Sequence, residues 1–284
     1  MVKIFGIIMR SIHFSIHLIK LNIFILLFLI AMVLTTQLYA GEVREETLIP
    51  PIPASQYKAP YHENKIDQKT HTVIIDGRHR TYQAYVPPNV EPGLRPAIVV
   101  LHGANRSGAS VVERWKSVAN MYGIILIGPD GTNKGWDFKI DNGDYMMDIL
   151  IDAHKNYPID PTRTYLFGHS AGGIFANYIS IKLSNIFAAT AIHAGRFASS
   201  RDTKLVKKAK RKIPIIYING TDDKGFPITK LRETAQAFAS NGHEIELKIL
   251  QGHNHWYYTL ADYINLLAWD FMRQHTLPAS SSVQ

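Results

Sequence analysis

Short apolar runs alternate with segments of helical spacing from residue 71 to residue 274. Several runs are apolar at every position, as in strands covered on both faces of a parallel sheet. The longer segments repeat apolar residues every three or four positions, the spacing of helices that face a core. The predicted strands cover residues 71–75, 80–86, 96–101, 124–127, 164–167, 187–192, 213–218 and 245–250; the predicted helices cover 109–122, 145–156, 230–241 and 257–274, with one more from residue 174 onward.

This alternation predicts an α/β fold, a mostly parallel sheet with helices on both faces. Asp76 and Gly77 join the first two strands as a hairpin, which adds antiparallel strands at the leading edge. In such sheets the chemistry lies at the carboxyl ends of the strands. Polar groups follow predicted strands at residues 102–105, 221–223 and 253–256, so we expect a site there.

The flanking segments lack such a pattern. Residues 41–70 contain four prolines and predict an extended lead-in with no fold of its own. We expect the catalytic domain to span residues 71–275, and residues 276–284 to form a flexible tail.

The first forty residues resemble a targeting segment. Their only charges are Lys3, Arg10 and Lys20, and residues 21–34 are apolar except for Asn22. Small and polar residues follow as far as Ala40. This order predicts a signal peptide over residues 1–40 and a secreted or periplasmic mature protein. The alternative is an uncleaved N-terminal anchor, which would attach the protein to a membrane.

The composition of the chain excludes several kinds of partner and site. The chain has 284 residues, 46% of them hydrophobic, and a net charge of +8. Without residues 1–40 it keeps 28 basic against 23 acidic groups, a net charge of +5. The basic cluster at residues 204–212 has no interleaved aromatics, so we expect a solvated surface and no nucleic-acid partner. The absence of cysteine excludes disulfides, thiolate metal sites and a cysteine nucleophile.

The sequence GHSAGG at residues 168–173 follows a predicted strand and precedes a helix. G-x-S-x-G in that context is the nucleophile elbow, a sharp turn that exposes the serine, here Ser170. Gly168 and Gly172 suit positions where strand and helix are too close for a Cβ atom. The helix N-terminus favours the negative charge that develops during acyl transfer.

A serine nucleophile needs a base, and the base needs a carboxylate. In elbow enzymes the chain order is serine, acid, histidine. Asp222 or Asp223 follows one predicted strand, and His253 or His255 follows the next. We favour His255, because aromatic residues and a helix follow it, and keep His253 as the alternative. A zinc site at this pair lacks a third ligand, so we predict no metal.

An oxyanion is stabilised by two backbone N–H groups. We expect one from Ala171, which follows the serine, and one from Ala104 after the 96–101 strand, with Gly103 as the alternative. His102 and His169 are predicted to be structural, with hydrogen bonds inside their own loops.

Motifs over residues 80–272 together resemble the polyhydroxybutyrate-depolymerase and feruloyl-esterase branch of the α/β-hydrolases. The resemblance rests on L-H-G, P-D-G with a following G-W, D-P-x-R-x-Y-x-x-G-x-S-x-G-G, N-G-T-x-D and G-H-x-H-W. It implies the α/β-hydrolase fold and a serine esterase without a cofactor, and it makes Asp223 the acid. Asn219 stands where a histidine is common, and the G-H-T-W ending of the depolymerases is replaced.

We therefore expect an exported serine esterase acting on feruloyl, acetyl-polysaccharide or hydroxyalkanoate esters, possibly polymeric ones. Trp136 and Trp256 are candidate substrate contacts, since aromatic faces pack on rings. The absence of a cap-sized insertion predicts an open site. The alternatives are a prolyl-oligopeptidase-like peptidase and, in another class, a non-catalytic hydrolase-fold binding module. The oligomeric state is not predicted.

Overall fold

The computed structural model describes residues 41–57, 61, 63–88 and 91–279. Contacts divide the chain into two units, Met1–Ala40 and Gly41–Gln284, and the second is described below. The signal peptide predicted for residues 1–40 lies outside the described residues. Within the described part of the chain, no helix has the length and apolar character needed to cross a membrane.

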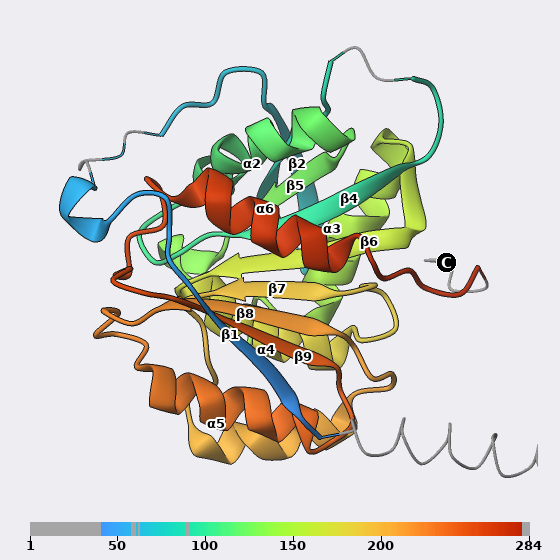
Figure 1. Cartoon of the computed structure of the whole chain (residues 1–284). Helices are drawn as coiled ribbons and strands as arrows, with labels where there is room; N and C mark the ends of the chain where they lie inside the picture. The colour runs from blue at the N-terminus through green and yellow to red at the C-terminus, as the bar shows by residue number, and fades with distance from the viewer. Residues whose placement is uncertain (1–40, 58–60, 62, 89–90, 280–284) are drawn as a thin grey trace, which may run out of the picture. The chain divides into compact units, whose positions relative to one another are not determined.

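In the described part of the chain, nine strands form one sheet in the order β1-β9-β8-β7-β6-β4-β5-β3-β2 (Figure 1). The hairpin of β2 and β3 is antiparallel, β3 pairs antiparallel with β5, and all other pairs are parallel. This arrangement confirms the predicted α/β fold. The strands are β1 (Val43–Leu48), β2 (Lys69–Ile75), β3 (Arg78–Tyr85), β4 (Arg95–Leu101), β5 (Ile125–Pro129), β6 (Ile159–His169), β7 (Thr190–His193), β8 (Ile215–Gly220) and β9 (Ile245–Leu250).

Helices cover both faces of the sheet. Buried side chains of α3, α4 and α5 pack in one core, and those of α2 and α6 in the other. The helices are α2 (Gly108–Tyr122), α3 (Gly143–Asn156), α4 (Ala171–Lys182), α5 (Ile228–Ala239) and α6 (Ala261–Met272), with short 3-10 helices η1 (Ala54–Gln56), η2 (Thr132–Lys134) and η3 (Ser200–Lys208). The last helix is shorter than the predicted 257–274.

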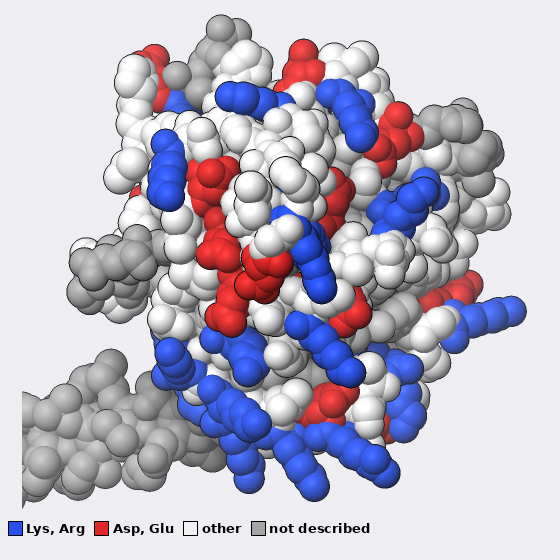
Figure 2. All heavy atoms as spheres, turned by 180° about the vertical axis from the view of Figure 1, so that it is seen from behind, with Lys and Arg blue, Asp and Glu red and all other residues white. Residues whose placement is uncertain are grey.

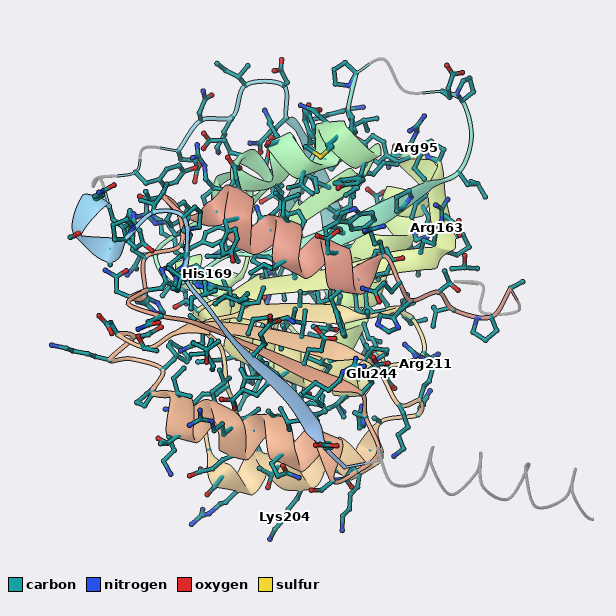
Figure 3. All side chains as sticks on the ribbon, viewed as in Figure 1. Arg95, Arg163, His169, Lys204, Arg211 and Glu244 are labelled. Atoms are coloured by element: carbon teal, nitrogen blue, oxygen red, sulfur yellow. The ribbon has the colours of Figure 1, made fainter. Side chains whose placement is uncertain are left out.

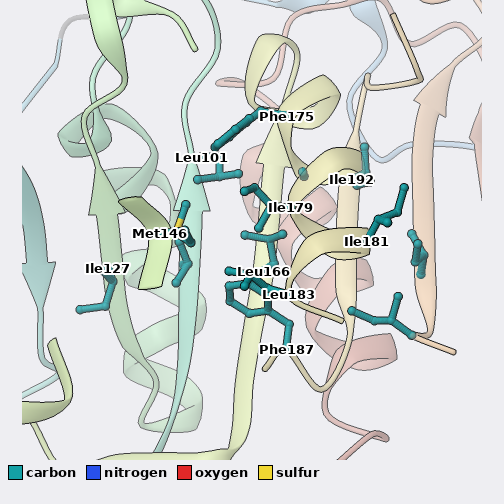
Figure 4. Close-up of a cluster of buried hydrophobic side chains, with 14 of the residues drawn as sticks. Leu101, Ile127, Met146, Leu166, Phe175, Ile179, Ile181, Leu183, Phe187 and Ile192 are labelled. Atoms are coloured by element: carbon teal, nitrogen blue, oxygen red, sulfur yellow. The ribbon is translucent and has the colours of Figure 1, made fainter. Parts of the chain in front are cut away.

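Strand β4 shows why the apolar runs are unbroken. Val99 and Leu101 point into the core under α3 and α4, whereas Ile98 and Val100 point into the core under α2 and α6. Side chains alternate between the faces of a strand, and both faces are covered here. Figure 4 shows the first core, where Leu101 and Leu166 of the sheet lie near Phe175 and Ile179 of α4.

The lead-in is not without structure, which corrects the prediction for residues 41–70. Residues 43–48 form β1, which pairs in parallel with β9 from Val43–Ile245 to Leu48–Leu250. Ion pairs hold this edge strand: Arg44 binds Glu244, Glu45 binds Arg232, and Glu46 binds Lys248. These charged side chains face solvent, so the strand carries no apolar alternation that sequence reasoning could detect.

The predicted tail also has an ordered start. Leu277 is buried, and its N–H donates to the carbonyl of Thr162 at 2.9 Å. The flexible tail predicted from residue 276 is therefore wrong at this position, because an apolar side chain packs into the core under α6.

The basic stretch lies at the surface, as predicted. Lys204, Lys207 and Lys208 of η3 are exposed and form no ion pair within the described chain. Lys204 points away from the domain at its lower end (Figure 3). Seen from behind, basic side chains gather at that same end (Figure 2).

Candidate active site

The turn between β6 and α4 has the strained geometry of an elbow. Ser170 has φ 57° and ψ −119°, in the positive-φ region that side chains rarely occupy. A Cβ atom on Gly168 would lie 2.4 Å from the carbonyl oxygen of Gly172, and one on Gly172 would lie 2.4 Å from that of Leu101. Glycine is therefore required at both positions, and the turn presents Ser170 beside the end of β4.

Ser170, His255 and Asp223 meet in one hydrogen-bonded row. His255 Nε2 lies 2.9 Å from Ser170 Oγ, and His255 Nδ1 lies 2.8 Å from Asp223 Oδ2. Asp223 follows β8 and His255 follows β9, so the row crosses the carboxyl ends of parallel strands. The structure thus brings together the three side chains predicted as the triad.

The environment of Asp223 favours its charged form. Its Oδ1 accepts the N–H groups of Gly225 at 2.9 Å and Phe226 at 3.0 Å. Burial by itself raises the pKa of this carboxyl, but the hydrogen bond and charge of His255 and the two amides outweigh it, so the pKa is lowered. Asp222 is exposed and accepts a hydrogen bond from Thr221, outside the row.

His253 lies in a second row, which we call the buried histidine row. It consists of the buried rings of His169, His193 and His253 and the hydroxyl of the half-buried Tyr57. His253 Nδ1 is 2.6 Å from Tyr57 Oη, and its Nε2 is 3.0 Å from His193 Nε2. His193 Nδ1 is 2.9 Å from His169 Nδ1. Both ring nitrogens of His253 are thus occupied away from Ser170, and burial lowers its pKa to about 4.

Sequence reasoning missed two members of this row. His193 ends β7 at the same edge as the other polar groups, a signal that could have found it. Tyr57 lies in the lead-in, where nothing in the sequence indicates a partner. His169 was expected to bond inside its own loop and bonds His193 on the next strand instead, because β6 and β7 pair there in register.

Two backbone N–H groups lie free near Ser170. Ala171 is the first residue of α4, so its N–H has no acceptor within the helix. Ala104 follows β4, and no described group accepts its N–H. A Cβ atom on Gly103 would lie 3.3 Å from Ser170 Cβ, so this loop lies against the serine. The predicted oxyanion donors are therefore on adjoining backbone segments.

His102 and Trp136 support that loop. His102 Nε2 accepts the N–H of Gly131 at 3.0 Å, so its Nδ1 donates to the Gly103 carbonyl at 2.8 Å, a structural role as predicted. Trp136 Nε1 donates to the His102 carbonyl at 2.9 Å, and its ring stacks on Phe175 with centroids 4.6 Å apart. Trp136 is half-buried and packs against the core.

An open cavity of about 410 Å³ lies beside His255. It is lined by residues 222–225 and 254–256, the loops that follow β8 and β9. Trp256 belongs to its wall, whereas Trp136 does not. Of the two predicted aromatic contacts, Trp256 thus lines this cavity, and Trp136 lies instead beside His102. In the described part of the chain, no three His, Asp or Glu side chains are arranged to hold a metal.

Comparisons with known proteins find esterases. A family model described as phospholipase/carboxylesterase matches residues 130–269. The chain is 29% identical over 148 residues to the poly(3-hydroxybutyrate) depolymerase of Ralstonia pickettii, covering 43% of this chain and 30% of that protein. It is 32% identical over 125 residues to feruloyl esterase B of Neurospora crassa, covering 39% of this chain and 42% of that protein.

A solved structure, a thermostable esterase, superposes with a TM-score of 0.61 at 18% identity and covers 74% of this chain and 63% of that one. The superposition shows that the chain has the α/β-hydrolase fold. Its sequence relatives include depolymerases and feruloyl esterases, which confirms the resemblance inferred from the motifs. The chain spans less than half the length of the curated relatives it matches, between 22% and 47%.

Proposed function

We propose that the protein is an exported serine esterase that cleaves carboxylic esters through an acyl-enzyme. The observation that carries this proposal is the row from Ser170 through His255 to Asp223, with hydrogen bonds of 2.9 and 2.8 Å. A serine hydroxyl bonded to an imidazole, which in turn is bonded to a carboxylate, is the arrangement that activates serine for acyl transfer.

In this mechanism Ser170 Oγ attacks the ester carbonyl while His255 Nε2 takes its proton. Asp223 orients the ring and stabilises the imidazolium through Nδ1–H. The N–H groups of Ala171 and Ala104 stabilise the tetrahedral oxyanion, and the dipole of α4 adds to this field. His255 then returns the proton to the departing alcohol, and a water molecule releases the acid from Ser170 in the reverse sequence.

The open cavity supports esters on large molecules. The wall beside His255 comes from two short loops, so an ester on a polymer chain or a bulky ring can reach Ser170 from solvent. The names of the relatives, a polyester depolymerase and a feruloyl esterase, support an ester of this kind. Trp256 is the aromatic contact proposed for its ring or acyl part.

Hydrolysis of 4-nitrophenyl acetate, 4-nitrophenyl butyrate and methyl ferulate by residues 41–284 tests the proposal. We expect turnover by the wild type and a loss of about 10³-fold or more in Ser170→Ala. Ser240→Ala, an exposed serine at the end of α5, is the matched control and should retain activity. Equal activity in Ser170→Ala, or an inert wild type, would overturn the proposal and favour a binding module.

Export rests on the sequence of residues 1–40. Expression of the full chain in a bacterium, followed by mass spectrometry of the mature protein, should give a chain that starts near Gly41 in the periplasm or medium. A full-length chain in the membrane fraction would replace this proposal with the anchored alternative.

A further inference from the structure

Arg106 lies next to the site with its charge unpaired. It follows Ala104 by two residues and is half-buried. Among the described residues it forms no ion pair and donates no hydrogen bond. By contrast, Arg80 binds Asp141 at 2.5 Å and Arg163 binds Asp160 at 2.7 Å. The N–H groups of this half-buried guanidinium therefore have only water or a ligand as acceptors.

Aromatic rings surround this guanidinium. Its Cζ lies 5.0 Å from the ring centre of Tyr258, 5.4 Å from that of Tyr61 and 5.9 Å from that of Trp256. Aromatic faces attract the cation and restrict its rotation, but they accept no hydrogen bond in the guanidinium plane. The in-plane N–H groups of Arg106 are therefore held in place and remain available to an acceptor.

The nearby carboxylate does not neutralise Arg106. Glu63 accepts the hydroxyl hydrogen of Ser107 and pairs with Lys65 at 3.7 Å. Its oxygens lie beyond ion-pair distance of the Arg106 guanidinium.

Arg106 also lies near residues of the site. Trp256, one of its aromatic neighbours, lines the cavity beside His255. Gly103, three residues before Arg106, lies against Ser170. The charge of Arg106 further lowers the pKa of His169, already depressed by burial, and His169 directly precedes Ser170. The unpaired cation thus lies on the loop that carries Ala104, beside Trp256 of the cavity wall.

We propose that Arg106 is a specificity-determining residue that binds a carboxylate on the ester substrate. A carboxylate matches the guanidinium fork with two charge-assisted hydrogen bonds. The substrate class is therefore an ester that carries a second, free carboxylate near the scissile bond, on either its alcohol or its acyl part. This inference rests on the esterase function proposed above and adds the charge of the substrate to it.

Two matched pairs of esters test it, each pair comparing a carboxylate with a carboxamide of the same shape. On the alcohol side the pair is 4-acetoxybenzoate and 4-acetoxybenzamide. On the acyl side it is mono-4-nitrophenyl glutarate and its amide, 4-nitrophenyl glutaramate. We expect the wild type to have a lower KM for the carboxylate in at least one pair, and that pair identifies the side of the ester that carries the charge.

Arg106→Gln should raise KM for the preferred carboxylate by about tenfold to a hundredfold, as loss of a charged hydrogen bond does. Its kcat, and both constants for the carboxamide, should stay within about twofold. Arg106→Lys keeps the charge without the fork and should restore part of the loss. Lys207→Gln removes an equal charge from the distant η3 and should change nothing.

Three outcomes would overturn the proposal: no preference for either carboxylate, an equal loss for both members of a pair in Arg106→Gln, or the same loss in Lys207→Gln. Thermal unfolding of each variant establishes that it is folded. If neutral esters are cleaved by the wild type and not by Ser170→Ala, such an outcome refutes the carboxylate site alone. If no ester is cleaved, both proposals fall.

Discussion

His253 and His255 stand two residues apart after β9, and their surroundings are opposite. The side chain of His255 is 43% exposed and joins a hydroxyl to a carboxylate. His253 is fully buried and joins an imidazole to a tyrosine hydroxyl. Burial lowers the pKa of His253 to about 4, so its ring stays neutral at pH 7. The pair teaches that burial and partners, not residue type or motif, decide which histidine can exchange a proton.

The largest effect on activity should come from the row of Ser170, His255 and Asp223. His255→Ala removes the proposed base, and we expect kcat to fall by about 10⁴-fold, because the hydroxyl of Ser170 then has no acceptor for its proton. Initial rates with 4-nitrophenyl acetate measure this. Retention of most activity in His255→Ala would break the distinction between the two histidines.

Asp223→Asn should lower kcat by about 10³-fold to 10⁴-fold while KM changes little, because an amide cannot stabilise the imidazolium of His255. Asp222→Asn is the matched control, since Asp222 is exposed and outside the row. A larger loss in the control than in Asp223→Asn would assign the acid to Asp222.

The buried row should affect stability more than catalysis. His253→Gln leaves Tyr57 and His193 with imperfect partners, and we expect the free energy of unfolding to fall by about 1 to 3 kcal/mol. The kcat should remain within about tenfold of the wild type. Urea denaturation and ester hydrolysis on the same samples measure both quantities. A large loss of kcat in a variant of unchanged stability would contradict a structural role for His253.

Acid should lower the free energy of unfolding through the buried histidine row. Burial depresses the pKa of His169, His193 and His253, the last to about 4, whereas an unfolded histidine titrates near 6.5. The unfolded chain therefore binds more protons between about pH 6.5 and pH 4. The free energy of unfolding should fall as pH drops through that window, by on the order of 1 kcal/mol per histidine per pH unit.

Urea denaturation at pH 7.5, 6.5 and 5.5 measures this slope. His253→Gln should reduce it, whereas His79→Gln, at an exposed position on β3, should leave it unchanged. Equal free energies of unfolding at pH 7.5 and pH 5.5 would show that burial does not hold these rings neutral.

The smallest effect should come from Tyr57→Phe. The ring is kept and one hydroxyl is lost, so we expect about 0.5 to 1.5 kcal/mol less stability. Thermal unfolding measures it. An unchanged unfolding temperature would mean that Tyr57 does not fasten the lead-in to His253.

The row of Ser170, His255 and Asp223 could be predicted because its sequence signals are local. Ser170 lies in a motif that specifies a strand, a turn and a helix. Asp223 and His255 each follow a strand of the same parallel sheet, and the edge of such a sheet brings strand ends together. Knowledge of the sheet therefore suffices to bring three distant residues to one place.

The positions of Tyr57, β1 and Trp136 could not be predicted, because they depend on contacts between residues far apart in the sequence. Tyr57 is 196 positions from His253, and nothing near Tyr57 indicates that partner. Strand β1 escaped prediction because charged side chains at an exposed edge replace apolar alternation. Trp136 could not be assigned from composition, since a tryptophan on the core and one in a cavity look the same in sequence.

The most direct test of the account is the intact mass of the protein after treatment with a fluorophosphonate, with the modified residue assigned by peptide fragmentation. Our account predicts one adduct, on Ser170, that forms at least about 10²-fold more slowly in His255→Ala and at nearly the wild-type rate in His253→Gln. An adduct on another residue, or rapid labelling in His255→Ala together with loss of labelling in His253→Gln, would contradict it.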